Sequence, residues 1–178
     1  MNLKEKKSEL VLLSNNLIDA IWTDRPARPR NKVFHLDEKY SGQSIQSKIS
    51  EVREILQAKS AKAVVVTMLD EVAWLFNLRG SDIDFNPGKQ GRVHNRFILT
   101  SLLVFFSYAV VTTDDATLFI ADGQMTEDAL QYLGDQVGIK PYTAFFDNLK
   151  ELPSTLDLSD KSVSPFLVFR YNINHTQN

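Results

Sequence analysis

The chain has 178 residues, 43% hydrophobic and 24% charged, with a formal net charge of −2 at pH 7 and no cysteine. These values predict one well-buried globular domain and exclude the disordered, fibrous and disulfide-framework classes. They provide no overall field that would attract nucleic acid or an anionic membrane, and the absence of cysteine fits a reducing cytoplasm.

The N-terminal part of the chain predicts a helix and then a linker. Apolar residues recur at spacings of three and four between Lys4 and Trp22, which favours a helix. Polar residues interrupt the apolar run, so it is not typical of a signal peptide. The prolines of DRPARPR, residues 24–30, then end the helix, because proline has no backbone N–H. The charged side chains of this linker are expected to face solvent: Arg25, Arg28 and Arg30.

The middle of the chain predicts a helix followed by a buried strand. Ser44 is a candidate N-cap for a helix whose apolar positions repeat at helical period. These positions are Ile45, Ile49, Val52, Ile55 and Leu56. The β-branched run AVVVTML, residues 63–69, is typical of a strand buried on both faces. Residues 70–78, DEVAWLFNL, predict a helical turn leading into a strand, and residues 79–88 predict a loop.

The C-terminal half predicts two paired strands, a helix, a short strand and a last helix. The paired strands are residues 105–113 and 116–122, joined by a turn at Asp114-Asp115. Thr126 is the candidate N-cap of the next helix, whose inward side chains are expected to be Ala129, Leu130 and Leu133. Residues 139–152 contain the short strand and the last helix. The predicted fold class is therefore α/β, with a mixed β-sheet flanked by helices.

A nearly uncharged run from Phe97 to Val111 raises the question of a membrane span. It has fifteen residues, fewer than the roughly 20 that a spanning helix needs. We interpret it as a buried strand or as an artefact of the gene model, and we expect no membrane association.

The sequence offers few candidates for a metal site. His35, His94 and His175 are far apart and match no ligand pattern, so they predict none. Asp82 and Asp84 could both bind a hard cation, but acids in a loop are more often solvated or capping groups.

Other chemical motifs are equally sparse. Asp70 and Glu71 directly follow the predicted buried strand, where α/β sheets often carry function. We favour the simpler interpretation that Asp70 caps the following helical turn. No serine lies in a nucleophile motif, and GKQG, residues 88–91, is too short for a phosphate-binding loop.

Three stretches together resemble the cytosolic-type Xaa-Pro aminopeptidase family, also called aminopeptidase P: IWTDRPARP, VVVTMLDEVAWLFNLRGSDIDFNP and FFSYAVV. The first is similar to the link between that family's first and middle domains. The other two are similar to the middle domain, a non-catalytic domain of the creatinase/prolidase N-terminal type. The resemblance implies that the parent protein releases an N-terminal residue that precedes proline.

The family's chemistry belongs to a separate C-terminal domain that binds two metal ions, for which we expect Mn²⁺. No part of this chain resembles that domain. The resemblance therefore implies no cofactor in this chain and no catalysis by the chain alone.

The candidate structural or substrate-side residues are Asp70, Trp74, Arg79, Asp82 and Asn86. We expect Trp74 to fix its turn on the core, because its large ring is apolar. We expect Arg79 to pair with Asp70 or Asp82, since a guanidinium presents a fork of donors suited to carboxylates. A structural role for Arg79 is favoured over substrate contact. The loop through Asn86 would face the metal-binding domain of the complete protein.

Two segments depart from the family pattern. Residues 88–103 place sixteen residues between the NP motif and the FFSYA motif. The codons that can specify Gly88-Lys89 include a splice donor, and those for Leu103-Val104 an acceptor. We interpret the segment as a short translated intron, with a genuine loop elaboration as the alternative. Residues 163–178 also lack the resemblance and form a non-family tail.

The predicted organisation has residues 1–24 as the helix and tail of a preceding domain, 25–32 as a linker and 33–162 as the creatinase/prolidase N-terminal-like domain. Two functions remain open. In the first, the chain is the middle domain of an aminopeptidase, and its partners are the missing first and metal-binding domains and, in the parent, a peptide with proline second. In the second, it is a free-standing interaction module, for example a homodimer. Both functions imply a cytoplasmic protein that binds neither nucleic acid nor membrane.

Overall fold

The computed structural model describes residues 16–83, 103–156 and 167–168. Its main feature is a five-stranded sheet in the order β6-β5-β4-β2-β7. The strands are β2 (Ala63–Val66), β4 (Ser107–Thr112), β5 (Ala116–Ile120), β6 (Gly138–Pro141) and β7 (Leu167–Val168). β4 pairs antiparallel with both β2 and β5, whereas β6 runs parallel to β5 and β7 runs parallel to β2. The sheet is therefore mixed, as the sequence predicted.

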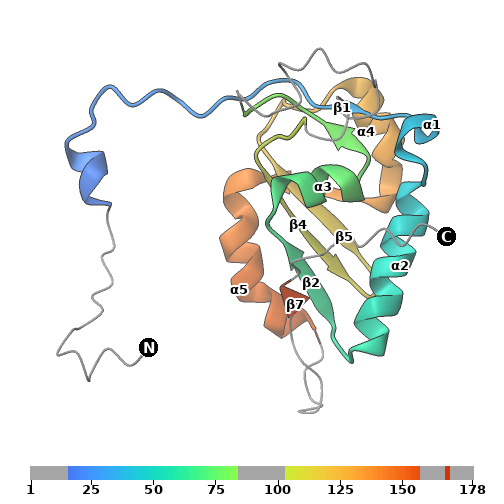
Figure 1. Ribbon diagram of the computed structural model, residues 1–178. Helices are drawn as coiled ribbons and strands as arrows, with labels where there is room; N and C mark the ends of the chain where they lie inside the picture. The colour runs from blue at the N-terminus through green and yellow to red at the C-terminus, as the bar shows by residue number, and fades with distance from the viewer. Residues whose placement is uncertain (1–15, 84–102, 157–166, 169–178) are drawn as a thin grey trace, which may run out of the picture.

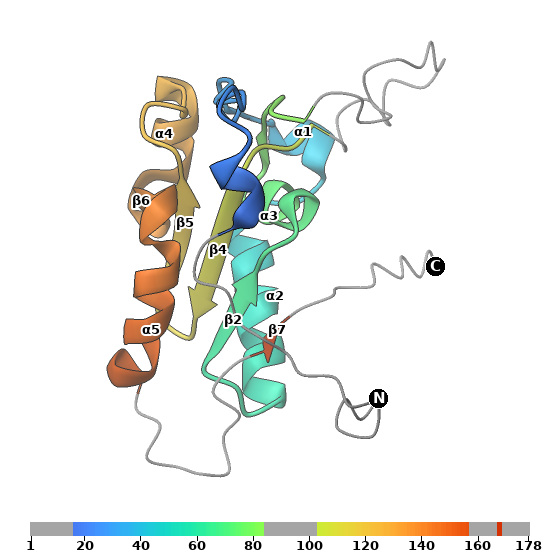
Figure 2. The same ribbon diagram turned by 90° about the vertical axis from the view of Figure 1, so that its left-hand side faces the viewer.

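Helices cover both faces of the sheet (Figures 1 and 2). One face packs against α2 (Ile45–Ala58), α3 (Leu69–Leu75) and α4 (Glu127–Leu133), and the other against α5 (Phe145–Thr155). Within β2, Val64 and Val66 join the first core, while Ala63 and Val65 join the second. This alternation confirms that the strand is buried on both faces.

Shorter elements complete the described chain. They are η2 (Leu17–Ala20), β1 (Phe34–His35), α1 (Glu38–Ser41), β3 (Leu78–Arg79), η3 (Gly134–Gln136) and η4 (Tyr142–Ala144). β1 and β3 form a separate antiparallel pair in which Phe34 lies opposite Arg79. This pair brings the end of the linker beside the segment that follows α3.

Two of the predicted caps, Ser44 and Thr126, and the predicted turn are present. The Ser44 hydroxyl accepts from the Ser47 N–H at 3.2 Å at the start of α2, and the Thr126 hydroxyl accepts from the Ala129 N–H at 3.3 Å at the start of α4. In the β4–β5 turn the Thr112 hydroxyl accepts from the N–H groups of the two aspartates, Asp114 and Asp115.

One predicted core position is wrong. Leu130 is 44% exposed, whereas Ala129 and Leu133 are fully buried. α4 has only two turns. Its buried stripe is one residue wide, with positions four apart, so Leu130 lies beside it.

The predicted N-terminal helix differs from the structure where it can be compared. Residues 4–15 lie outside the described part, and the described end is a single 3₁₀ turn, η2, set apart from the sheet (Figure 1). The apolar side chains of this turn and of the two residues after it are exposed: Leu17, Ile18, Ile21 and Trp22. Within the described part of the chain these side chains therefore lack the packing that stabilises short helices.

The apolar run from Phe97 to Val111 ends in β4, and its residues before Leu103 lie outside the described part. Among the described residues, no helix is both long and apolar enough to cross a membrane. The proposed insert 88–103 is described only at Leu103, and the tail 163–178 only at residues 167–168.

Candidate functional site

The segment from Asp70 to Asp82 begins as a short helix after β2. Met68 occupies the N-cap position of α3 and makes no side-chain cap hydrogen bond. Asp70 is exposed in the first turn. The expectation that Asp70 caps this helix is therefore wrong, although an acid in the first turn still interacts favourably with the positive end of the helix dipole.

Asp82 is a buried acid that hydrogen-bonds to three separate parts of the chain. It is only 3% exposed. Its Oδ1 accepts from the Asn31 N–H at 2.7 Å, and its Oδ2 accepts from the Phe106 N–H at 3.0 Å and from Gln124 Nε2 at 2.6 Å. Because these donors satisfy both carboxylate oxygens, the burial of Asp82 is tolerated. Asp82 thus joins the linker, the segment before β4 and the loop after β5.

Arg79 is 7% exposed in β3. Its Nη1 donates to the carbonyl oxygens of Ala73 at 2.9 Å and Leu78 at 2.7 Å. Burial lowers the pKa of the guanidinium. These contacts fix the end of α3 against β3, which supports a structural role, while the pairing of Arg79 with Asp70 or Asp82 stays a prediction.

Trp74 is half-buried on α3 and packs against the first core. The Lys48 ammonium lies 4.6 Å from the centre of its ring, and Lys48 Nζ donates to the Trp74 carbonyl at 2.7 Å. A cation over an indole face is stabilised by the ring quadrupole. Trp74 therefore contributes both a carbonyl and a ring face to the binding of a lysine from α2.

Sequence reasoning missed the cluster centred on Asn77 and Lys48. Asn77 is fully buried at φ 51°, just after α3, and its Oδ1 accepts from Lys48 Nζ at 2.5 Å. Its Nδ2 donates to the Gln43 carbonyl and to the Tyr132 hydroxyl. A signal was available, because Lys48 lies three residues after Ile45 and therefore within the apolar stripe of the predicted helix.

Lys48 is 1% exposed. Burial lowers its pKa to about 8, and the positive charge of the nearby Arg79 also lowers the pKa. The position suits a cation because the last carbonyls of α3 carry the negative end of the helix dipole. Lys48 thus connects α2 to the end of α3.

His35 extends this cluster to the surface. Its ring stacks on Tyr132 with centroids 4.2 Å apart, and its Nδ1 lies 2.8 Å from Asp128 Oδ2. Burial raises the pKa of Tyr132. The other two histidines, His94 and His175, lie outside the described residues.

The described residues contain no group of three His, Cys, Asp or Glu side chains able to hold a metal ion. Asp84 and Asn86 lie outside them, so their roles stay predictions. The structure places Trp74 and Arg79 around the end of α3, it places Asp82 in a buried junction with Asn31, Phe106 and Gln124, and it leaves Asp70 exposed. This arrangement can position backbone segments through hydrogen bonds to their N–H and carbonyl groups.

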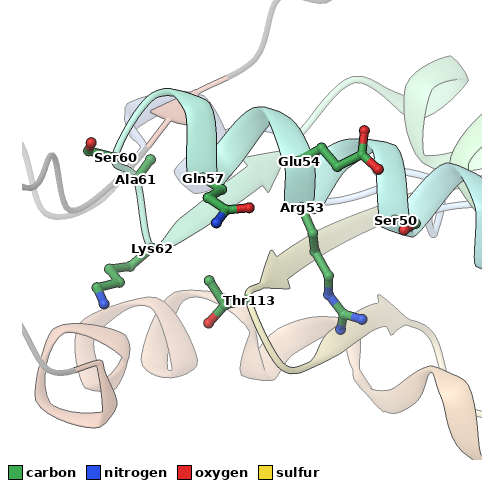
Figure 3. Close-up of a pocket in the computed structure, with 8 residues that line it drawn as sticks. All are labelled: Ser50, Arg53, Glu54, Gln57, Ser60, Ala61, Lys62 and Thr113. Carbon is green, nitrogen blue, oxygen red and sulfur yellow. The ribbon is translucent and has the colours of Figure 1, made fainter.

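A pocket of about 510 Å³ lies along α2 and the β4–β5 turn (Figure 3). Its lining residues are Ser50, Arg53, Glu54, Gln57, Ser60, Ala61, Lys62 and Thr113. Arg53 donates to the carbonyls of Thr112 and Asp114, so part of its guanidinium serves to attach α2 to the turn. We assign no chemistry to this pocket.

Comparison with known sequences gives the family. The creatinase/prolidase N-terminal domain family matches residues 24–93 and 101–175. The chain belongs to this family. The fold and the family resemblance expected from the sequence are therefore confirmed.

This creatinase/prolidase N-terminal domain has longer relatives. It is 53% identical over 169 residues to a probable Xaa-Pro aminopeptidase P of Coprinopsis cinerea, covering 94% of this chain and 25% of that protein. It is 50% identical over 161 residues to a protein of the same description from Laccaria bicolor, covering 90% of this chain and 22% of that protein. The chain thus spans about a quarter of the length of these relatives.

A solved structure is also similar to this domain. It is the X-prolyl aminopeptidase of Caenorhabditis elegans, described as a cytosolic enzyme with a di-nuclear active site. The two share 29% sequence identity and a TM-score of 0.74, over 88% of this chain and 23% of that protein.

Proposed function

We propose that this chain is the non-catalytic middle domain of a Xaa-Pro aminopeptidase-like protein. One observation carries the proposal: the chain matches the creatinase/prolidase N-terminal domain over most of its length but spans only about a quarter of its aminopeptidase relatives. The complete protein would release an N-terminal residue that precedes proline. This domain would pack beside the metal-binding domain and help to restrict access to its site.

The metal chemistry would belong to the rest of the protein. The di-nuclear site named for the Caenorhabditis elegans enzyme supports two metal ions in the complete protein, for which Mn²⁺ is our expectation. The described residues of this domain hold no set of ligands for them. The description of that enzyme as cytosolic supports a cytoplasmic location for the complete protein.

Within this domain, we assign Trp74, Arg79 and Asp82 to positioning the segment that continues toward Asn86. Their contacts with Lys48, with two main-chain carbonyls and with Asn31, Phe106 and Gln124 support this assignment. The loop through Asn86 would then face the metal-binding domain.

A domain exchange tests the proposal. Residues 25–162 would replace the corresponding stretch of the Coprinopsis cinerea relative, once with and once without residues 88–103. The exchanged protein lacking residues 88–103 should release the first residue of a peptide with proline second, in the presence of Mn²⁺, within about tenfold of the unaltered relative. The 178-residue chain alone should release none.

Two outcomes would contradict the proposal. One is an exchanged protein that is folded and monodisperse but inactive while the unaltered relative is active. The other is release by the 178-residue chain alone that a chelator abolishes. A stable homodimer of this chain, detected by light scattering, together with a folded but inactive exchange protein, would support the interaction-module alternative.

The family match extends through residue 175, which argues against the expectation that residues 163–178 depart from the domain. The status of residues 88–103 is a separate question about the gene, and we propose that this segment is a translated intron. The spliced transcript, when sequenced, should lack these sixteen codons. A transcript that retains them would instead establish a genuine loop elaboration.

A further inference from the structure

A second pocket, of about 290 Å³, lies at the edge of the sheet where β5 and β6 end. Its lining residues are Arg28, Pro29, Arg30, Phe106, Ala121, Asp122, Gln124, Pro141, Tyr142 and Thr143. β5 and β6 are parallel, and ligands of α/β proteins bind preferentially beyond the carboxyl ends of such strands. We call this pocket, with the lining residues just given, the edge pocket. Its size suits one or two amino-acid residues rather than a larger ligand.

The edge pocket carries two arginines whose donors are unused within the described part of the chain, Arg28 and Arg30. Among the described residues, neither Arg28 nor Arg30 has a hydrogen-bond or ion-pair partner. By contrast, Arg25 pairs with Asp19, and Arg53 donates to two carbonyls. The opposing charge in the lining is the single carboxylate of Asp122.

Arg28 is held in place although its donors are unused. Its guanidinium lies 4.7 Å from the ring centre of Phe106 and 5.0 Å from that of Tyr142. Rings of this kind attract the flat face of a guanidinium and leave the N–H groups at its edge available. Those N–H groups form the fork that carboxylates bind in a bidentate manner.

The start of α5 adds to the positive potential. Thr143 lines the edge pocket, and Ala144, the N-cap residue, provides no side-chain hydrogen bond to the helix. α5 has 11 residues and follows η4 directly, with the Phe145 N–H already donating to the Tyr142 carbonyl, so the contribution of its start is the positive end of the helix dipole. This dipole favours an anionic group.

Gln124, which also lines the edge pocket, has a side-chain oxygen that needs a hydrogen-bond donor. It is 2% exposed, and its Nε2 donates to Asp82. Its Oε1 is buried and accepts no hydrogen bond from the described residues. A buried acceptor without a donor is costly, so a ligand that brings an N–H group would be favoured.

We propose that the edge pocket binds an acidic side chain of a polypeptide segment from outside this chain. The carboxylate of aspartate or glutamate matches Arg28, Arg30 and the start of α5, and a main-chain N–H of the same segment matches Gln124. The proposal goes beyond the aminopeptidase assignment and does not depend on it.

Titration of the 178-residue chain, followed by ¹H–¹⁵N NMR, tests this site. The probe is acetyl-Gly-Glu-Gly-amide, and the matched control peptide has glutamine in place of glutamate. The glutamate peptide should produce saturable shifts of the Gln124 side-chain amide and the Thr143 backbone amide. The R28Q/R30Q variant should bind it at least about tenfold more weakly.

K59Q/K62Q is the control variant, because it removes the same charge away from the edge pocket. Its affinity should stay within about twofold of the unaltered chain. Equal shifts with the glutamine peptide, or no saturable shift at Gln124 and Thr143, would overturn the proposal. Inorganic phosphate that saturates the same signals at equal concentration would overturn the assignment to a polypeptide and leave a simple anion site. The spectrum of each variant also reports whether it is folded.

Discussion

At the scale of single residues, Asp82 is the shared acceptor of the buried junction. Substitution by alanine leaves three N–H donors, from Asn31, Phe106 and Gln124, without their acceptor. We expect D82A to lower the free energy of unfolding by about 3 kcal/mol, since each buried donor without an acceptor is penalised. Urea unfolding measures this loss. Asp70 is exposed, so D70A should cost less than about 1 kcal/mol. Equal losses of unfolding free energy in D82A and D70A would show that the Asp82 hydrogen bonds do not stabilise the fold.

Lys48 makes stability depend on pH. Its pKa is about 8 in the folded chain and near the ordinary 10.5 when unfolded, so the unfolded chain holds the proton more tightly. The burial of charged Lys48 therefore lowers the stability of the fold in full below pH 8, and this loss disappears as the pH rises to 10.5.

When the pH rises from 7 to 10, the free energy of unfolding of the unaltered chain should therefore increase relative to that of K48M by about 2 to 3 kcal/mol. Unfolding at both pH values measures it. The same comparison with K59M, at an exposed lysine, should show no such shift.

At the scale of elements, the attachment of α5 depends on one of two adjacent aromatic residues. Phe145 is 2% exposed and stacks on Tyr108 with centroids 4.0 Å apart, whereas Phe146 is 61% exposed. F145A should cost about 3 to 5 kcal/mol, because it leaves a cavity in the second core. F146A should cost less than about 1 kcal/mol. Thermal or urea unfolding of the two variants measures these costs. A similar cost for both would mean that α5 is not attached through the Phe145 ring.

Elements whose partners are close in sequence were predictable. The Ser44 cap, the apolar stripe of α2, the β-branched run of β2 and the β4–β5 turn all depend on local spacing. The pair of β1 and β3 was not predicted as a pair, because each has two residues and the two are far apart in the chain. Leu130 was placed inward because helical period alone cannot tell how wide a buried stripe is.

The candidate junction was predictable only in part. The sequence indicated Trp74, Arg79 and Asp82 as a group, because they lie close together in one motif. It could not indicate that Gln124 would donate to Asp82 across 42 positions, or that Arg28 would lie over Phe106. Such contacts depend on the tertiary fold and leave no periodic signal.

At the scale of the whole molecule, the two ends of the segment between Asp82 and Val104 lie together. The Asp82 N–H donates to the Val104 carbonyl at 3.1 Å. Removal of residues 88–103 would leave five residues, 83–87, to connect these hydrogen-bonded positions. Five residues are enough for a hairpin-type loop.

We therefore expect the variant lacking residues 88–103 to keep the fold. It should be more stable by about 1 kcal/mol, because a shorter loop loses less entropy on closure. Circular dichroism and thermal unfolding measure both properties. A deletion variant that is unfolded or clearly less stable would show that the sixteen residues contribute to the core.

The outermost described strand on one side of the sheet, β6, has a sequence that discourages growth of the sheet. All four of its residues are exposed, and it ends in Lys140 and Pro141. Proline has no N–H to offer an incoming strand, and lysine repels a second copy of itself. At high concentration, copies of this chain are therefore not expected to join edge to edge into fibres through β6.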